Sequence, residues 1–143
     1  MSQALDKLFP IEIDAPEAMI EFGQTIAQHL RSGDVLALIG NLGAGKTHLA
    51  QGVARHFNYK GSVTSPTFGL VHEYAGTKLI HADLYRLDDP RELLSIGWED
   101  YLERDAILVI EWADRFPELM PEGTHWIKVD HTTTGRKLTY ALH

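Results

Sequence analysis

The stretch Gly40-Asn41-Leu42-Gly43-Ala44-Gly45-Lys46-Thr47 fits the pattern of a P-loop: Gly, four residues, Gly, Lys, then Ser or Thr. Before it comes the apolar run Val35–Ile39, which is typical of a strand buried on both faces. After it, His48–Phe57 carries apolar residues at helical spacing. A P-loop requires this order of strand, loop and helix. The sequence therefore predicts a phosphate-binding loop rather than a glycine-rich turn that binds nothing.

The residue types of this loop suit phosphate chemistry. Glycines let successive backbone N–H groups face phosphate oxygens, and the N-terminus of the following helix adds its positive dipole end. We expect Lys46 to reach the outer phosphates and to act in catalysis, and Thr47 to bind Mg²⁺. The predicted nucleotide-binding residues are Asn41, Leu42, Gly43, Ala44, Gly45, Lys46, Thr47 and His48.

A second acidic residue is needed to help hold the metal, and Glu111 is the first candidate. It follows Ile107–Ile110, the end of a second fully apolar strand predicted at 106–110. Ligands gather at the carboxyl ends of strands in α/β sheets. Many P-loop proteins have Asp here, so Glu is a departure with a longer reach. The alternative is a solvated acid at a strand exit.

Asp83 is the second acidic candidate. In the stretch 81–86, alternate residues share one face if the segment is a strand, and that face carries His81, Asp83 and Tyr85. Asp83 would hold a metal-bound water or orient the attacking water; otherwise it is a capping or salt-bridging acid. We interpret His81 and Tyr85 as structural neighbours rather than catalysts. Trp112 either covers the nucleotide site or is a core or rim aromatic.

A hydroxyl-rich segment follows the P-loop helix. Its residues are Thr64, Ser65, Pro66 and Thr67. Switch loops that sense the γ-phosphate occupy this position in P-loop NTPases. We therefore predict a switch loop, with an ordinary turn as the alternative.

The remaining hydrophobic pattern predicts an α/β protein: a P-loop NTPase fold with a mixed sheet, parallel core strands, antiparallel additions and helices on both faces. Residues 1–143 are expected to form a single domain. The further expected elements are an edge strand at 8–13, a helix at 15–31 capped by Asp14, a hairpin of 68–74 and 78–85, two short helices within 88–100 separated by Gly97, and a terminal strand pair at 126–131 and 137–142.

Composition narrows the classes of function. The 143-residue chain has no cysteine, which excludes disulfide scaffolds, thiol catalysis and cysteine-bound zinc. Its net charge of −7 makes it a poor candidate for binding nucleic acid alone. No apolar run approaches the ~20 residues of a membrane span, and the N-terminal residues do not resemble a targeting signal. We expect a cytoplasmic protein that does not contact membrane.

Four motifs together specify a family more closely than the P-loop alone does: Gly40–Thr47, Thr64–Phe68, His81–Arg86 and Ile110–Trp112. In this order they resemble the TsaE (YjeE) family, the ATPases of bacterial tRNA threonylcarbamoyladenosine biosynthesis. The resemblance covers nearly the whole chain. It implies ATP/ADP and Mg²⁺ as ligands and slow ATPase activity that supports TsaB and TsaD, with tRNA contacted only through that complex.

By motif position, the resemblance makes Thr47 and Glu111 magnesium ligands, Asp83 a catalytic or metal-proximal acid, and 65–67 a switch loop. Two other readings stay open. A small-molecule or nucleoside kinase would make ADP faster when its second substrate is added. A nucleotide-sensing adaptor would bind its partner in a nucleotide-dependent way even after loss of hydrolysis.

Overall fold

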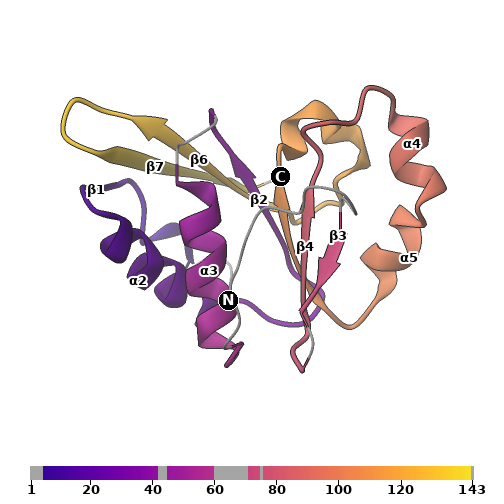
Figure 1. Cartoon of the computed structure of the whole chain (residues 1–143), viewed down its shortest axis with the longest axis horizontal. Coiled ribbons are helices and arrows are strands. Elements are labelled where there is room, and N and C mark those ends of the chain that lie inside the picture. The colour runs from indigo at the N-terminus through magenta and orange to yellow at the C-terminus, as the bar shows by residue number, and fades with distance from the viewer. Residues whose placement is uncertain (1–4, 42–44, 60–70, 75, 143) are drawn as a thin grey trace.

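The computed structural model describes residues 5–41, 45–59, 71–74 and 76–142. Its strands form a seven-stranded sheet in the order β1-β7-β6-β2-β5-β4-β3 (Figure 1). The strands are β1 (Ile11–Ile13), β2 (Val35–Ile39), β3 (Val71–Glu73), β4 (Leu79–Asp83), β5 (Ile107–Glu111), β6 (His125–His131) and β7 (Arg136–Leu142).

The centre of the sheet is parallel and its edges are antiparallel. β2 pairs in parallel with β5 and β6, and β5 pairs in parallel with β4. β3, β7 and β1 then add as antiparallel strands. The unbroken apolar run Val35–Ile39 forms the central strand β2, because this strand is covered on both faces. The predicted α/β class with a mixed sheet is confirmed.

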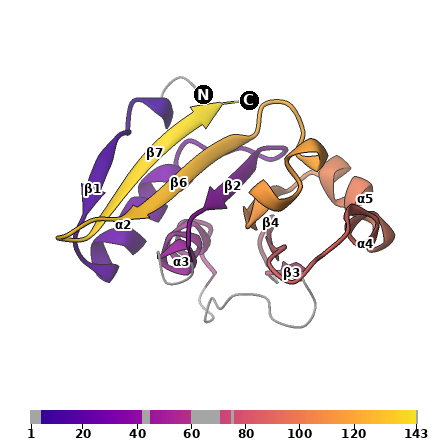
Figure 2. The ribbon, with the colours of Figure 1, turned by 90° about the horizontal axis from the view of Figure 1, so that it is seen from above.

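Helices cover both faces of this sheet. The helices are α2 (Pro16–Ala27), α3 (Lys46–His56), α4 (Pro90–Ser95) and α5 (Trp98–Glu103), with short 3-10 turns η1 (Ala113–Arg115) and η2 (Pro117–Leu119). Leu36 and Leu38 pack into the cluster formed with α2 and α3. Their neighbours Val35 and Ala37 pack into the cluster on the α4–α5 side. Figure 2 shows α2 and α3 side by side, apart from α4 and α5.

Two glycines bring α2 and α3 into close contact. A Cβ at Gly23 would lie 2.3 Å from the carbonyl oxygen of Leu49, and one at Gly52 would lie 2.0 Å from that of Ile20. Any side chain at either position would push the helices apart. The close approach fixes α3 against the core, and with it the position of the first turn of α3.

Three expected boundaries were wrong. Asp14 does not cap α2; Ala15 occupies the N-cap position in an extended conformation without a side-chain cap. The reason is Pro16, which takes the first helical turn and disfavours helical geometry in the residue before it. The helix ends at Ala27 rather than Arg31, because the chain continues in tighter i+3 hydrogen bonds. The expected strand 8–13 is shortened to β1, and it lies at the sheet edge as Pro10 indicated.

The other expected elements are confirmed with small shifts. β3 and β4 form the hairpin, Gly97 separates α4 from α5 in a left-handed conformation, and the Asp89 side chain caps α4 by accepting from the Arg91 N–H. The helix expected at 48–57 begins two residues earlier, at Lys46. Within the described residues, no helix is long and apolar enough to cross a membrane.

Candidate active site

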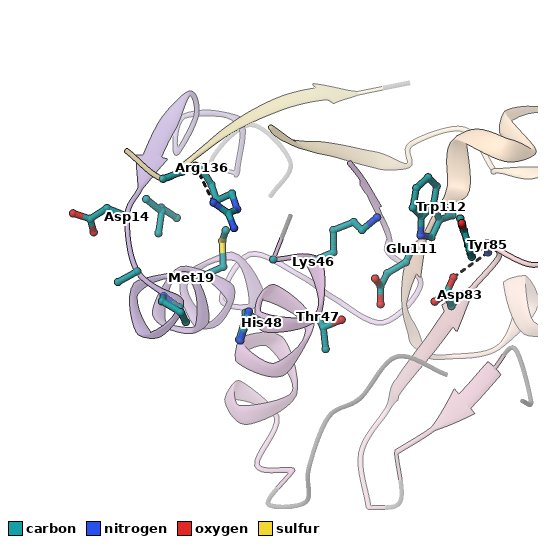
Figure 3. Close-up of a pocket in the computed structure, with 15 residues that line it drawn as sticks. Asp14, Met19, Lys46, Thr47, His48, Asp83, Tyr85, Glu111, Trp112 and Arg136 are labelled. Carbon is teal, nitrogen blue, oxygen red and sulfur yellow. Dashed lines mark hydrogen bonds between the residues drawn. The ribbon is translucent and has the colours of Figure 1, made fainter. Parts of the chain in front are cut away.

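A pocket of about 400 Å³ lies where β4 and β5 end and α3 begins (Figure 3). It is lined by Lys46, Thr47 and His48 from the first turn of α3 and by Asp83 and Glu111 from the ends of β4 and β5. The structure therefore brings together the predicted site residues that come from three separate segments. Leu42, Gly43 and Ala44 of the predicted loop, and Thr64, Ser65, Pro66 and Thr67 of the predicted switch loop, lie outside the described residues. Asn41 is described and exposed.

The entry into α3 depends on Gly45. Its φ of +102° is in the left-handed region, where a side chain is strained. A Cβ here would also lie 3.0 Å from the Cε of Met19. Gly45 thus turns the chain so that α3 starts at Lys46, with its first N–H groups and positive dipole end at the pocket.

Lys46 places a cation inside the pocket wall. Its side chain is only 4% exposed. The Nζ donates to the carbonyl oxygen of Gly40 and lies 3.8 Å from the centre of the Trp112 ring. Burial lowers the pKa of the Lys46 ammonium, while the charges of Glu111 and Asp83 oppose that shift. Because Lys46 lines the pocket as a buried ammonium, it can pair with an anionic ligand there.

Trp112 is placed by an unusual backbone conformation. Its φ is +61°, and its N–H donates to the carbonyl oxygen of Leu38 at 3.2 Å. Its ring contacts Tyr85, with 4.8 Å between ring centres. Because Trp112 lines the pocket and covers Lys46, the structure favours the interpretation of a residue that covers the site.

Asp83 and Glu111 are direct neighbours across the parallel pairing of β4 and β5. The Oδ1 of Asp83 accepts from the N–H of Tyr85 at 3.0 Å, which orients that carboxylate. Glu111 is only 3% exposed. This burial disagrees with the alternative that Glu111 is a solvent-exposed acid at the end of its strand. In Figure 3, Thr47 lies on α3 on the same side of the pocket as these two carboxylates.

The carboxylate oxygens of Asp83 and Glu111 and the hydroxyl of Thr47 suit a Mg²⁺ ion that is bound together with a phosphate ligand. Mg²⁺ in nucleotide sites takes one or two carboxylates and completes its shell with phosphate oxygens and water. Among the described residues, no group of three or more His, Cys, Asp or Glu side chains could hold a metal ion by itself. The pair of carboxylates beside Thr47 and Lys46 therefore fits a shared metal–phosphate site rather than a closed protein cage.

The sequence interpretation missed two features of the site. His81, treated as a structural neighbour, has its Nε2 2.7 Å from the Oε2 of Glu111. At the opposite end of the pocket lie Asp14, Met19 and Arg136 (Figure 3). Arg136 arrives there because it pairs with Ile13 across β7 and β1. The sequence did hold a signal for His81, because the alternation of the strand places it on the same face as Asp83. No local pattern in the sequence pointed to Arg136.

Comparison with known proteins extends this picture. The model of the family described as "Threonylcarbamoyl adenosine biosynthesis protein TsaE" matches residues 13–138. The chain belongs to the TsaE family. The match contains all the described site residues named above, from Asp14 to Arg136.

Individual TsaE-family relatives agree over most of the chain. A tRNA threonylcarbamoyladenosine biosynthesis protein TsaE of Haemophilus influenzae is 38% identical over 85% of this chain and 81% of its own. The protein of the same name from Nostoc sp. is 38% identical over 79% of this chain and 73% of its own. Among solved structures, Bacillus subtilis YdiB superimposes with a TM-score of 0.76 at 26% identity, over 94% of this chain and 84% of that one.

Proposed function

We propose that this protein binds and hydrolyses ATP with Mg²⁺, and that hydrolysis supports threonylcarbamoyl modification of a tRNA adenosine by TsaB and TsaD. The observation that carries the proposal is the buried Lys46 at the start of α3, facing Asp83 and Glu111 on neighbouring parallel strands. Family membership supports the pathway. In this proposal residues 1–143 act as a single ATPase domain.

The size of the pocket and the charged residues that line it support the proposal. Its volume of about 400 Å³ lies within the range of small-molecule pockets. We place the phosphates at Lys46 and the N–H groups of the first turn of α3. The base and ribose then extend toward Met19 and Arg136, at the end away from the carboxylates.

The proposed roles follow from the residue chemistry. Thr47 and Glu111 hold Mg²⁺, which when bound neutralises charge on the phosphates. Lys46 supplies a full positive charge to the outer phosphates, and its three N–H donors allow it to bind them while one still donates to the carbonyl of Gly40. Asp83, oriented by the Tyr85 N–H, positions the attacking water. Trp112 covers Lys46 and limits access of bulk water to it.

The described residues also support a need for a partner. An arginine that stabilises the transition state, often supplied in trans, is worth 10³–10⁵ in rate. Arg115 donates to the carbonyl of Leu87, and Arg136 lines the pocket end opposite Asp83. No arginine of the described segments lines the pocket at the carboxylate end. We therefore infer slow hydrolysis by the protein alone and faster hydrolysis with TsaB and TsaD.

The test measures phosphate release by the protein alone and with TsaB and TsaD added, together with complex formation on a sizing column in ATP. The expected result is a slow basal rate that the pair increases, with a complex that forms in ATP. An unchanged rate and no complex would contradict the assignment to this pathway. A rate that rises instead with a nucleoside or sugar would indicate a kinase.

A further inference from the structure

Three buried side chains form a continuous hydrogen-bonded chain that ends at the site. The Oη of Tyr74 is 2.8 Å from the Nδ1 of His81, and the Nε2 of His81 is 2.7 Å from the Oε2 of Glu111. Tyr74 is 1% exposed, His81 0% and Glu111 3%. Water therefore competes little for these bonds, and loss of Tyr74 or of Glu111 removes a hydrogen-bond partner from the buried ring of His81.

The sheet register brings these residues together. Asp83 pairs with Glu111 and His81 with Val109, so His81 and Glu111 lie diagonally on adjacent strands. Both point to the face covered by α2 and α3, because Leu79 and Val109, two residues away, belong to that core cluster. Tyr74 follows β3 and is packed on that face by Tyr59, with 4.7 Å between the ring centres. Packing thus holds the outer end of the chain in place.

The chemistry of the end groups gives the chain a direction. Burial raises the pKa of Tyr74 above its ordinary value, so its hydroxyl keeps its proton and can donate to Nδ1. An ionised carboxylate only accepts hydrogen bonds. The geometry therefore makes the Nε2–H of His81 the donor to Glu111, with Nδ1 facing the hydroxyl of Tyr74.

We propose that His81 is a positioning residue, which holds the carboxylate of Glu111 in the orientation that binds the metal, and that Tyr74 holds the ring of His81 in the orientation that reaches Glu111. The inference rests on the proposed function, because it assigns Glu111 to Mg²⁺. Groups that orient a metal ligand through such hydrogen bonds typically contribute 10–100-fold to metal affinity or activity.

The chain offers a matched control in His125. It is 4% exposed, and its Nδ1 is 2.7 Å from the Oη of Tyr140. It does not line the pocket. His125→Leu therefore removes a buried histidine–tyrosine pair without touching a carboxylate of the site, whereas His81→Leu removes the group between Tyr74 and Glu111.

The first measurement is the tautomer of His81 in the nucleotide-free protein, from the side-chain nitrogen chemical shifts in NMR, with His81→Gln used to assign the signal. We expect the Nε2–H tautomer in the unaltered protein and, in Tyr74→Phe, a changed chemical shift of Nδ1, because that nitrogen loses the hydroxyl that donates to it. The Nδ1–H tautomer in the unaltered protein would overturn the inference, and so would an unchanged signal in Tyr74→Phe.

The second measurement is the affinity for Mn²⁺, as a paramagnetic probe of the magnesium site, of the protein saturated with ADP. We expect His81→Leu to weaken Mn²⁺ binding about 10–100-fold, His81→Gln to recover most of it because its amide can still donate to Glu111, and His125→Leu to leave it unchanged. Full-affinity Mn²⁺ binding by His81→Leu would overturn the inference alone. Failure of the unaltered protein to bind ADP with Mn²⁺ would instead contradict the proposed function.

Should His81→Leu fail to fold, His81→Gln and Tyr74→Phe keep the test decisive. Tyr74→Phe should weaken Mn²⁺ binding in the same direction but less, because the bond to Glu111 remains. Equal Mn²⁺ affinity in Tyr74→Phe and the unaltered protein would remove Tyr74 from the proposal.

Discussion

His81 and His125 are both buried, and each is hydrogen-bonded through Nδ1 to a tyrosine hydroxyl. The two pairs nevertheless lie at opposite ends of the parallel strands. His125 is the first residue of β6, while Glu111, the partner of His81, is the last residue of β5. Because ligands gather at the carboxyl ends of parallel strands, the His81–Tyr74 pair is hydrogen-bonded to a residue that lines the pocket, Glu111, whereas the His125–Tyr140 pair lies at the other end. The same side-chain pair can thus serve a site or only the packing, depending on which end of the strands it occupies.

The electrostatics of His125 agree with a packing role. Burial lowers its pKa from the ordinary value of 6.5, and the charge of Asp34 opposes this only in part. His125 therefore stays neutral in the folded protein under conditions in which the unfolded chain begins to protonate it. The Tyr74–His81–Glu111 chain and the His125–Tyr140 pair should therefore differ in their effects on activity, on stability and on the pH dependence of stability.

The largest effect is expected at the site end, in Glu111→Ala. Loss of the carboxylate should lower hydrolysis by about 100-fold or more, the usual effect of deleting one group that stabilises the transition state. It should also lower the free energy of unfolding by about 1–3 kcal/mol, because the Nε2–H of buried His81 loses its acceptor.

Glu111→Gln is the matched control, since its amide oxygen still accepts from His81. Phosphate release and chemical denaturation measure the two effects separately. Normal hydrolysis by Glu111→Gln would show that the charge of Glu111 has no catalytic role.

Asp83→Asn should have the next largest effect. The amide oxygen can keep the bond from the Tyr85 N–H, so the local turn remains while the negative charge is lost. We expect hydrolysis to fall about 10–100-fold with little change in the midpoint of unfolding. Steady-state kinetics and thermal unfolding check this, and an unchanged kcat would assign Asp83 to the turn alone.

His125→Leu should change stability and leave the site intact. One hydrogen bond, between His125 and Tyr140, is lost, which costs about 1 kcal/mol of unfolding free energy. Affinity for ATP and kcat should match those of the unaltered protein. A loss of ATP binding in a folded His125→Leu protein would show that the two regions are not independent.

The last expected effect is a pH dependence of the unfolding free energy that arises from His125. The folded-state pKa of His125 lies below its unfolded value, so the unfolded chain binds its proton first as the pH falls. Stability contributed by neutral His125 is full above about pH 6.5 and is lost as the pH falls toward the folded-state pKa, by at most about 1.4 kcal/mol per pH unit. Denaturation of unaltered protein and His125→Gln between pH 7.5 and 5 measures the difference. If the unfolding free energies of the two proteins changed with pH in the same way, the pH dependence could not be assigned to His125.

Local sequence signals predicted the central parts of the fold and site. The apolar run Val35–Ile39 predicted β2, and the Gly-Lys-Thr that ends the loop predicted a helix directly after it, although α3 begins two residues earlier than expected, at Lys46. Glu111 was singled out because it follows an apolar strand, and Asp83 because of the alternation in 81–86; in the structure both are the last residues of their strands. The strand positions could be predicted because they depend on residues that are neighbours in the sequence, whereas the roles of Asp83 and Glu111 stay predictions.

Long-range pairing accounts for what was missed. The bond between His81 and Glu111 requires β4 to lie next to β5 in one particular register, which neither segment specifies alone. Arg136 reaches the pocket only because β7 pairs with β1. The cap of α2 failed for a local reason, because Pro16 forces Ala15 out of helical geometry whatever Asp14 offers.

The central claim is that Lys46 holds the phosphates of a nucleotide in this pocket. Calorimetric titration of ATP with Mg²⁺ tests it in the unaltered protein, in Lys46→Ala and in Lys128→Ala, a control at an exposed lysine of β6. A charge-assisted hydrogen bond contributes about 1.5–3 kcal/mol, so Lys46→Ala should bind ATP at least about tenfold more weakly, while Lys128→Ala matches the unaltered protein. Absence of ATP binding by the unaltered protein, or equal affinity in Lys46→Ala, would contradict the claim.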